Sequence, residues 1–337
     1  MTAPRRLLLA AALLTVLSVR ADLIWSPETG WRSAGGVVSP LVAPGDQGGK
    51  ALDLMNAARS AEEQGAKGRA LSLYESVAKQ FPHSIYAGEA LYRAGNLRLD
   101  RHQYVTAFEH YQDAIQQHPD NTHFNEIIGQ EYTISAALID GARGYWWGVI
   151  PGFTNRRQGV DYGETILKTA PSSDYAPLVL MNLSRGHQRL GEKDESKDAL
   201  DRLISDYPRS LLAPDAYLRL AQAYAADVQG PEYDQGATNQ AITYFEDFTL
   251  QFPKDPNVPS AAKGIADLRT VLAKGKIQIG DFYFYKRDNF VAARVFYNEA
   301  ITTYPDSAEA AIARSRLAEV DKVEPTYKPR KKFLGIF

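Results

Sequence analysis

The chain of 337 residues contains no cysteine. This absence excludes disulfide bonds, a cysteine nucleophile and a lipid attached to a cysteine at a signal-peptide junction. The folded state must therefore be stabilised by its packed core alone.

A hydrophobic run long enough to cross a membrane, about 20 residues, is also missing at the amino terminus. The run there, "LLLAAALLTVLSV" at 7–19, follows Arg5 and Arg6 and precedes a small-x-small pattern formed by Val19 and Ala21. These features are typical of a signal peptide. We therefore predict a signal peptide at 1–21, cleaved after Ala21, and an exported protein. The alternative is an uncleaved amino-terminal anchor.

The chain carries no large excess of positive or negative charge. The chain has 38 Lys and Arg against 40 Asp and Glu, a net charge of -2, which becomes 35 - 40 = -5 without residues 1–21. Such a protein is not basic enough to suggest a nucleic-acid partner. The hydrophobic content of 45% is that of an ordinary globular protein.

Catalytic motifs are missing as well. The sequence has no G-x-S-x-G and no H-E-x-x-H, and no two of its histidines are spaced i, i+4 on one helix. We therefore expect no enzyme activity, no cofactor and no metal site.

What is present is a repeated phrase, seen in "RALSLYESVAKQFPHS", "TAFEHYQDAIQQHPDN" and "AARVFYNEAITTYPDS". A small residue lies twelve positions before a proline, and a large apolar residue usually lies eight before it. The six anchoring prolines are Pro82, Pro119, Pro171, Pro208, Pro253 and Pro305. This pattern is typical of the second helix of a tetratricopeptide (TPR) repeat, which the proline ends.

We therefore predict an all-α, TPR-like α-solenoid of about six helix pairs over 51–321, closed by a capping helix after Pro305. The proline spacings of 37, 52, 37, 45 and 52 imply inserts of 8 and 15 residues. The second insert of 15 predicts one long helix over 260–287. The third repeat is the weakest, because Gly159 and Gly163 interrupt its second helix.

Residues 22–50, rich in proline and glycine, are predicted to form an irregular linker. We expect Trp25 and Trp31 to pack onto the neighbouring domain, with a short exposed docking motif as the alternative.

The first helices of the early repeats predict a peptide-binding groove. The positions expected to face the concave side are Met55, Arg59, Glu89, Tyr92, Asn96 and Leu99. An aromatic face, an amide, a soft apolar surface and a cation together suit an extended chain with an apolar anchor and a carboxylate. The alternative is an unused surface.

The insert at 144–158, "GYWWGVIPGFTNRRQ", must leave the solenoid because its glycines and proline forbid a regular helix. Trp146 and Trp147 lie in its apolar part. Either the insert folds back onto the third repeat, where Gly159 and Gly163 leave room, or it stays exposed and docks a partner protein, with Arg156 and Arg157 as the polar rim.

The tail at 322–337 carries Pro325 and Pro329, followed by basic and then apolar residues. We expect an extended segment outside the solenoid. It is either a soluble tail or a segment that docks to a partner or to anionic lipid.

The stretch "LAKGKIQIGDFYFYKRDNFVAARVFYNEAITTYPDS" at 272–307 resembles the BamD family of outer-membrane β-barrel assembly factors, as does the junction "FPHSIYAGEALYRAG" at 81–95. The resemblance covers about 50–320. It implies a scaffold at the periplasm or the periplasmic face of the outer membrane, a partner with POTRA domains, and a groove ligand that is a segment of an unfolded barrel protein. Membrane association would be peripheral or through partners.

One departure separates this chain from that family, whose members usually begin their mature chain with a lipid-bearing cysteine. Here Asp22 follows Ala21. The alternative is therefore a periplasmic TPR adaptor that coordinates envelope or peptidoglycan machinery, similar to the CpoB type.

Overall fold

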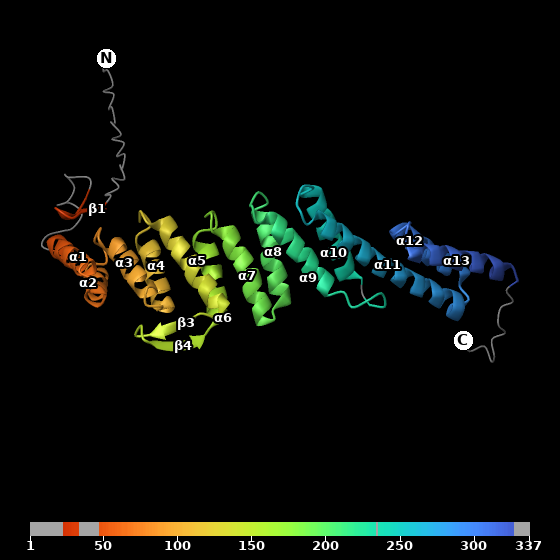
Figure 1. Cartoon of the computed structure of the whole chain (residues 1–337), viewed down its shortest axis with the longest axis horizontal. Coiled ribbons are helices and arrows are strands. Elements are labelled where there is room, and N and C mark those ends of the chain that lie inside the picture. Colours follow the sequence, from red (N-terminus) through yellow and green to blue (C-terminus); the bar gives the residue numbers. More distant parts are fainter. Residues whose placement is uncertain (1–22, 34–46, 234, 327–337) are drawn as a thin grey trace, which may run out of the picture. The chain divides into compact units, whose positions relative to one another are not determined.

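Figure 1 presents a computed structural model of the chain, which describes residues 23–33, 47–233 and 235–326. The predicted signal peptide and residues 327–337 of the predicted tail lie outside these ranges. The chain divides into two compact units. Unit 1 holds the described residues up to Ile134 together with Ala142–Thr154, and unit 2 holds Ser135–Gly141 and the described residues from Asn155 onward.

Unit 1 is built from helix pairs and two β-hairpins. Its helices are α1 (Gln47–Glu63), α2 (Lys67–Gln80), α3 (Ala87–Leu99), α4 (Tyr104–Gln117) and the first part of α5 (Phe124–Asp140). One antiparallel hairpin joins β1 (Leu23–Ser26) to β2 (Gly30–Ser33), and the other joins β3 (Arg143–Trp146) to β4 (Ile150–Thr154).

Unit 2 continues the helix pairs. Its helices after α5 are α6 (Arg156–Thr169), α7 (Ala176–Leu190), α8 (Lys193–Asp206), α9 (Ala213–Ala226), α10 (Gly236–Gln251), α11 (Val258–Arg287), α12 (Phe290–Thr303) and α13 (Ala308–Val323). A short 3-10 turn, η1 (Glu324–Thr326), follows. The predicted all-α solenoid of six helix pairs with a closing helix is confirmed in the described residues.

The repeated phrase explains where the helices end and how they pack. Each second helix ends two residues before its anchoring proline. The tyrosines eight positions before those prolines, Tyr74, Tyr111 and Tyr297, are fully buried. A Cβ at Gly95 of α3 would lie 2.5 Å from the Tyr111 ring, so this first helix can approach its partner only with glycine there.

The third repeat departs from its prediction. Residues Gly159 and Gly163 do not interrupt α6, which is a regular helix of 14 residues. They serve close packing instead: a Cβ at Gly159 would lie 2.8 Å from the backbone nitrogen of Ile139, and one at Gly163 would lie 2.7 Å from Leu183. The glycines therefore bring α6 against its neighbours.

The boundaries predicted at the ends also change. Residues 23–33 form the β1–β2 hairpin rather than an irregular linker, and α1 begins at Gln47. Helix α13 runs to Val323, two residues past the predicted solenoid boundary. The predicted long helix is confirmed as α11, with 30 residues. Within the described ranges, no helix combines the length and the apolar composition needed to cross a membrane.

Candidate protein-binding surfaces

The residues predicted to form a groove in unit 1 come from the first helices α1 and α3. Tyr92, Asn96 and Leu99 of α3 are half-buried, as is Arg59 of α1. The side chain of Glu89 is 6% exposed and that of Met55 is fully buried. These predicted groove residues therefore differ in their access to solvent.

The β1–β2 hairpin explains the burial of Met55. The Trp31 side chain packs into the same core cluster as Met55, and its backbone nitrogen donates a hydrogen bond of 3.0 Å to Oδ1 of Asn56. The guanidinium carbon of Arg59 lies 4.4 Å from the centre of the Trp25 ring. The expected packing of both tryptophans is thus confirmed. Met55, predicted as an exposed groove residue, is a core residue instead.

The cations of this face are paired. Arg59 forms ion pairs with Glu62 at 3.4 Å and Glu63 at 3.2 Å, and Arg93 forms them with Glu62 at 3.4 Å and Glu89 at 2.6 Å. The guanidinium of Arg59, predicted to offer a cation to a ligand carboxylate, is therefore already engaged by neighbouring glutamates.

Glu89 is the buried centre of this network. Burial raises the pKa of its carboxyl, but the hydrogen bonds and charges of His123 and Arg93 outweigh burial and leave the pKa below its ordinary value. The hydrogen bond to Glu89 raises the pKa of His123, whose Nε2 lies 2.9 Å from the carboxylate. The site therefore holds an ionised carboxylate beneath its surface.

Tyr92 and Asn96 offer the accessible surface of the face. The Tyr92 ring stacks on the His123 ring at 4.1 Å, and its hydroxyl donates a hydrogen bond of 2.7 Å to Glu126. Oδ1 of Asn96 accepts a hydrogen bond of 2.6 Å from the Tyr111 hydroxyl. This leaves a flat aromatic pair and an amide nitrogen among carboxylates, a surface suited to backbone amides and to cationic side chains.

A second surface is the β3–β4 hairpin, which carries Trp146 and Trp147. One alternative gave its side chains the space at Gly159 and Gly163, but within unit 2 the neighbours of α6 already fill that space. The hairpin packs beside the α3–α4 turn, where the backbone nitrogen of Tyr145 donates a hydrogen bond of 2.9 Å to the carbonyl of His102. Five large apolar side chains stay exposed, which we call the hairpin patch: Trp146, Trp147, Val149, Ile150 and Phe153.

A third surface, in unit 2, arises from the length of α11. An α-helix turns about 100° per residue. Gly264 touches Phe245 of α10, and Phe282 follows 18 residues later, so Phe282 lies on the same side after about five turns. Gly280, which touches Tyr297 of α12, lies roughly 160° away. The second half of α11 therefore has one face against which no helix among the described residues packs.

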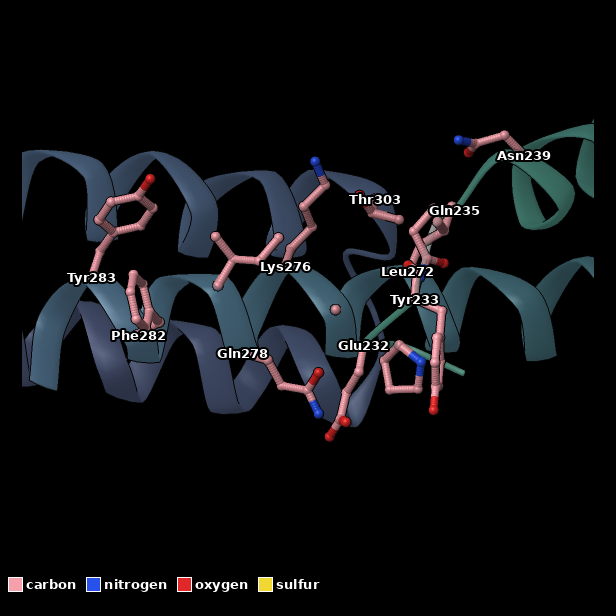
Figure 2. Close-up of a pocket in the computed structure, with 13 residues that line it drawn as sticks. Glu232, Tyr233, Gln235, Asn239, Leu272, Lys276, Gln278, Phe282, Tyr283 and Thr303 are labelled. Carbon is pink, nitrogen blue, oxygen red and sulfur yellow. The ribbon is translucent and has the colours of Figure 1, made fainter. Parts of the chain in front are cut away.

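The loop before α10 covers part of that face and leaves a hollow of about 570 Å³. Figure 2 shows Phe282 and Tyr283 at one end of the hollow and Glu232 and Tyr233 at the other. A Cβ at Gly275 would lie 2.7 Å from the carbonyl oxygen of Pro231, so the loop can lie this close to α11 only because residue 275 is glycine. Phe282 remains 45% exposed.

The sequence predicted neither the β1–β2 hairpin nor this hollow. A signal for the hairpin was available, because "LIWS" and "GWRS" flank the turn residues "PET" and place two tryptophans in register. The hollow had no comparable signal, since it depends on how the loop before α10 lies against a continuous α11.

Residues 158–323 match a family described as YfiO, outer membrane lipoprotein, and residues 54–84 and 89–121 match a tetratricopeptide repeat. The outer membrane protein assembly factor BamD of Caulobacter vibrioides is 25% identical over 165 residues, which are 49% of this chain and 54% of that protein. BamD of Rickettsia prowazekii is 24% identical over 166 residues, 49% of this chain and 66% of that protein.

The chain thus spans about half to two thirds of the length of these curated relatives. Among solved structures, a tetratricopeptide repeat protein from Parabacteroides merdae aligns with 81% of this chain and 99% of its own, at 12% identity and a TM-score of 0.34. The family match covers α6 to α13, the helix pairs of unit 2. The chain is therefore a BamD-like tetratricopeptide repeat protein.

Proposed function

We propose that the chain is a non-enzymatic scaffold of the bacterial cell envelope, at the periplasmic side of the outer membrane, that binds partner proteins during the assembly of β-barrel proteins. The observation that carries this proposal is the match of residues 158–323 to the outer membrane lipoprotein family. A stack of helix pairs offers long surfaces that bind peptides and helices. The absence of catalytic motifs from the sequence agrees with a binding role.

The scaffold would engage a barrel-assembly component with POTRA domains through unit 2. The half-exposed side chains of Ile279 and Phe282 supply apolar contact area on α11, and Gln278 lies beside them in the hollow. Apolar and aromatic residues of this kind are common at the centre of protein interfaces.

Capture of a purified POTRA-domain protein by the full chain tests this role. Ile279→Ser with Phe282→Ser should weaken capture by about tenfold or more, since each removes a large apolar contact. Leu250→Ser is the matched control, because Leu250 of α10 is an exposed apolar residue outside the hollow. Equal capture by both variants would contradict the assignment of this surface.

In unit 1, the ligand would be an extended segment of an unfolded barrel protein lying on Tyr92, Asn96 and Leu99, with the ion-paired Arg59 and Glu89 in the network beneath. Only Tyr92, Asn96 and Leu99 have half-buried side chains free of ion pairs. Photo-crosslinking of such a peptide should fall in Tyr92→Ala with Asn96→Ala. Tyr92→Phe, which keeps the ring and loses the hydroxyl with its hydrogen bonds to Glu126 and Asn96, should retain the crosslinking. Unchanged crosslinking in the double variant would refute the groove.

A second candidate is a periplasmic adaptor of the CpoB type, serving envelope or peptidoglycan machinery. It is favoured by the first two repeats, whose match is to a general tetratricopeptide repeat. Affinity capture from cell envelopes separates the two functions, since recovery of Tol-Pal or peptidoglycan proteins without barrel-assembly proteins would select the adaptor.

A further inference from the structure

The hairpin patch is the largest group of exposed apolar side chains on one short segment in the described part of the chain. Trp147 is 78% exposed, Phe153 is 85% exposed, and Val149 lies between them in sequence with 73% exposure. The largest exposed apolar patch on a soluble protein is often a site of interaction.

The hairpin holds this patch outward by using its other side as an anchor. The Tyr145 ring packs 5.5 Å from the His102 ring, and Gly144 and Gly148 lie against the α3–α4 turn. At Gly148, the aliphatic stem of Arg101 lies 3.3 Å from where a Cβ would be. With the inner side fixed in this way, Trp146 and Phe153 meet each other edge to face on the outer side.

The turn places a tryptophan where the backbone disfavours it. Trp147 has a φ of 52°, in the left-handed region, and Gly148 has a φ of 75°. Asparagine and glycine occupy such positions easily, whereas a large side chain does so at a cost in strain. A strained backbone that displays an exposed tryptophan at the hairpin tip points to a functional role for that side chain.

The size and charge of the patch indicate its partner. Its three aromatic and two aliphatic side chains present roughly 500 Å² of apolar surface, a size that suits shallow insertion of a few side chains into a bilayer. The hairpin from Arg143 to Thr154 contains no acidic residue and one basic one, so it lacks the mixed polar rim of a protein interface.

We propose that the β3–β4 hairpin inserts its tip into the headgroup region of a lipid bilayer and holds the protein against an anionic membrane surface. Tryptophan prefers the boundary between headgroups and acyl chains, where its ring is apolar and its N–H can reach water or a headgroup. Shallow insertion of a few such side chains gives reversible binding without a membrane span.

Two cations at the base of the hairpin favour anionic lipid. Neither Arg101 nor Arg143 forms an ion pair within the described ranges. Arg143 is exposed at the start of β3, and the stem of Arg101 supports the turn glycine while its guanidinium lies beside Gly68 of α2. Basic groups beside an inserting apolar tip add attraction to anionic headgroups, and salt screens that attraction.

Vesicle co-sedimentation of the full chain tests the proposal, with vesicles of pure phosphatidylcholine and of phosphatidylcholine mixed with phosphatidylglycerol. We expect binding to the mixed vesicles that weakens as salt is added. Trp147→Asn with Phe153→Ser should lower this binding by about tenfold or more. The asparagine suits the left-handed turn, so the hairpin should keep its fold. Leu211→Ser, which removes a 98% exposed leucine from unit 2, should leave binding unchanged.

A second measurement does not depend on variants. Tryptophan fluorescence of the native chain should be quenched by phospholipids brominated on their acyl chains, because a ring at the headgroup boundary approaches the bromines. Absence of vesicle binding, absence of quenching, or equal binding by the hairpin variant and the native chain would overturn the proposal. Loss of protein capture in the hairpin variant without any vesicle binding would assign the patch to a protein partner instead. Vesicle binding can fail while POTRA-domain capture through α11 persists, so the two proposals are separable.

Discussion

At the scale of single residues, Glu131 on α5 has an unusual environment. Its side chain is fully buried, and Oε1 accepts a hydrogen bond of 2.7 Å from Gln112, while Oε2 has no hydrogen-bond partner among the described residues. Burial raises the pKa of this carboxyl to about 8, and the bond from Gln112 offsets that effect only in part. The folded protein therefore holds Glu131 largely protonated at neutral pH.

Glu131→Gln should stabilise the protein at alkaline pH. The unfolded chain releases the Glu131 proton near pH 4.5, whereas the folded chain keeps it until about pH 8. The free energy of unfolding therefore decreases as the pH rises from about 4.5 to about 8. Below about pH 4.5, where Glu131 is protonated in both states, this loss of stability is absent. We expect the variant to raise Tm by a few degrees at pH 8 and to change it little at pH 4.5, as measured by circular dichroism.

The control for this effect is Glu109→Gln, which makes the same change at an exposed carboxylate on the neighbouring helix α4. The control should show no gain that grows with pH. An equal gain in Tm at pH 4.5 and pH 8 for Glu131→Gln would contradict the assignment of a buried, protonated carboxyl.

Individual residues also show how much of the packing could be predicted from the sequence. The large residues eight positions before the prolines were predicted to fill gaps between helices, and Tyr74, Tyr111 and Tyr297 do so. The periodic pattern determines these contacts because they are local to one helix pair. Met55 was wrongly predicted as exposed, because its cover, Trp31, comes from a segment outside the periodic pattern.

At the scale of elements, glycine controls how closely helices approach. The interruptions expected at Gly159 and Gly163 follow from intrinsic helix propensity, in which glycine costs about 1 kcal/mol. The packing of α6 reverses that expectation, because the missing side chains let α6 lie against the end of α5. A propensity scale cannot predict this, since the gain comes from tertiary contact.

Gly159→Ala should destabilise the third repeat. Its methyl group would meet the backbone nitrogen of Ile139 at 2.8 Å and Cβ of Leu138 at 2.9 Å, and backbone atoms cannot move aside as a flexible side chain can. Overpacking of this kind costs about 1–3 kcal/mol, which thermal unfolding would report as a lower Tm.

Gly49→Ala provides the comparison for the same chemical change. Gly49 also lies in a helix, but a Cβ there has open space around it. Its Tm should stay the same or rise slightly, since alanine favours the helix. A gain in stability at both positions would show that propensity, and not close approach, dominates at Gly159.

At the scale of the whole molecule, each helix pair packs against its neighbours and not against distant pairs. One core cluster contains Trp31, Met55 and Tyr74, and separate clusters surround Phe245 and Tyr297. In such arrays the stability is approximately a sum over repeats and the contacts between adjacent repeats. Damage to one repeat should therefore stay local.

Hydrogen exchange on the full chain tests this expectation. Tyr74→Ala should leave a cavity that costs about 3–5 kcal/mol, and it should speed exchange in α1 to α3 while leaving α11 to α13 unchanged. Tyr297→Ala should produce the reverse pattern. Faster exchange at both ends in either variant would show a cooperativity that extends along the whole chain.

Helix α11 has a mechanical consequence within unit 2. Successive helix pairs from α6 to α10 are joined by short turns, each of which is a place where adjacent pairs can bend relative to each other. By contrast, α10 and α12 both pack on one uninterrupted helix, α11, which contacts α10 with its first half and α12 with its second. A force applied by a partner at α12 or α13 is therefore transmitted to α10 through one continuous helix of roughly 45 Å. This part of unit 2 should move as a rigid segment and should bend little.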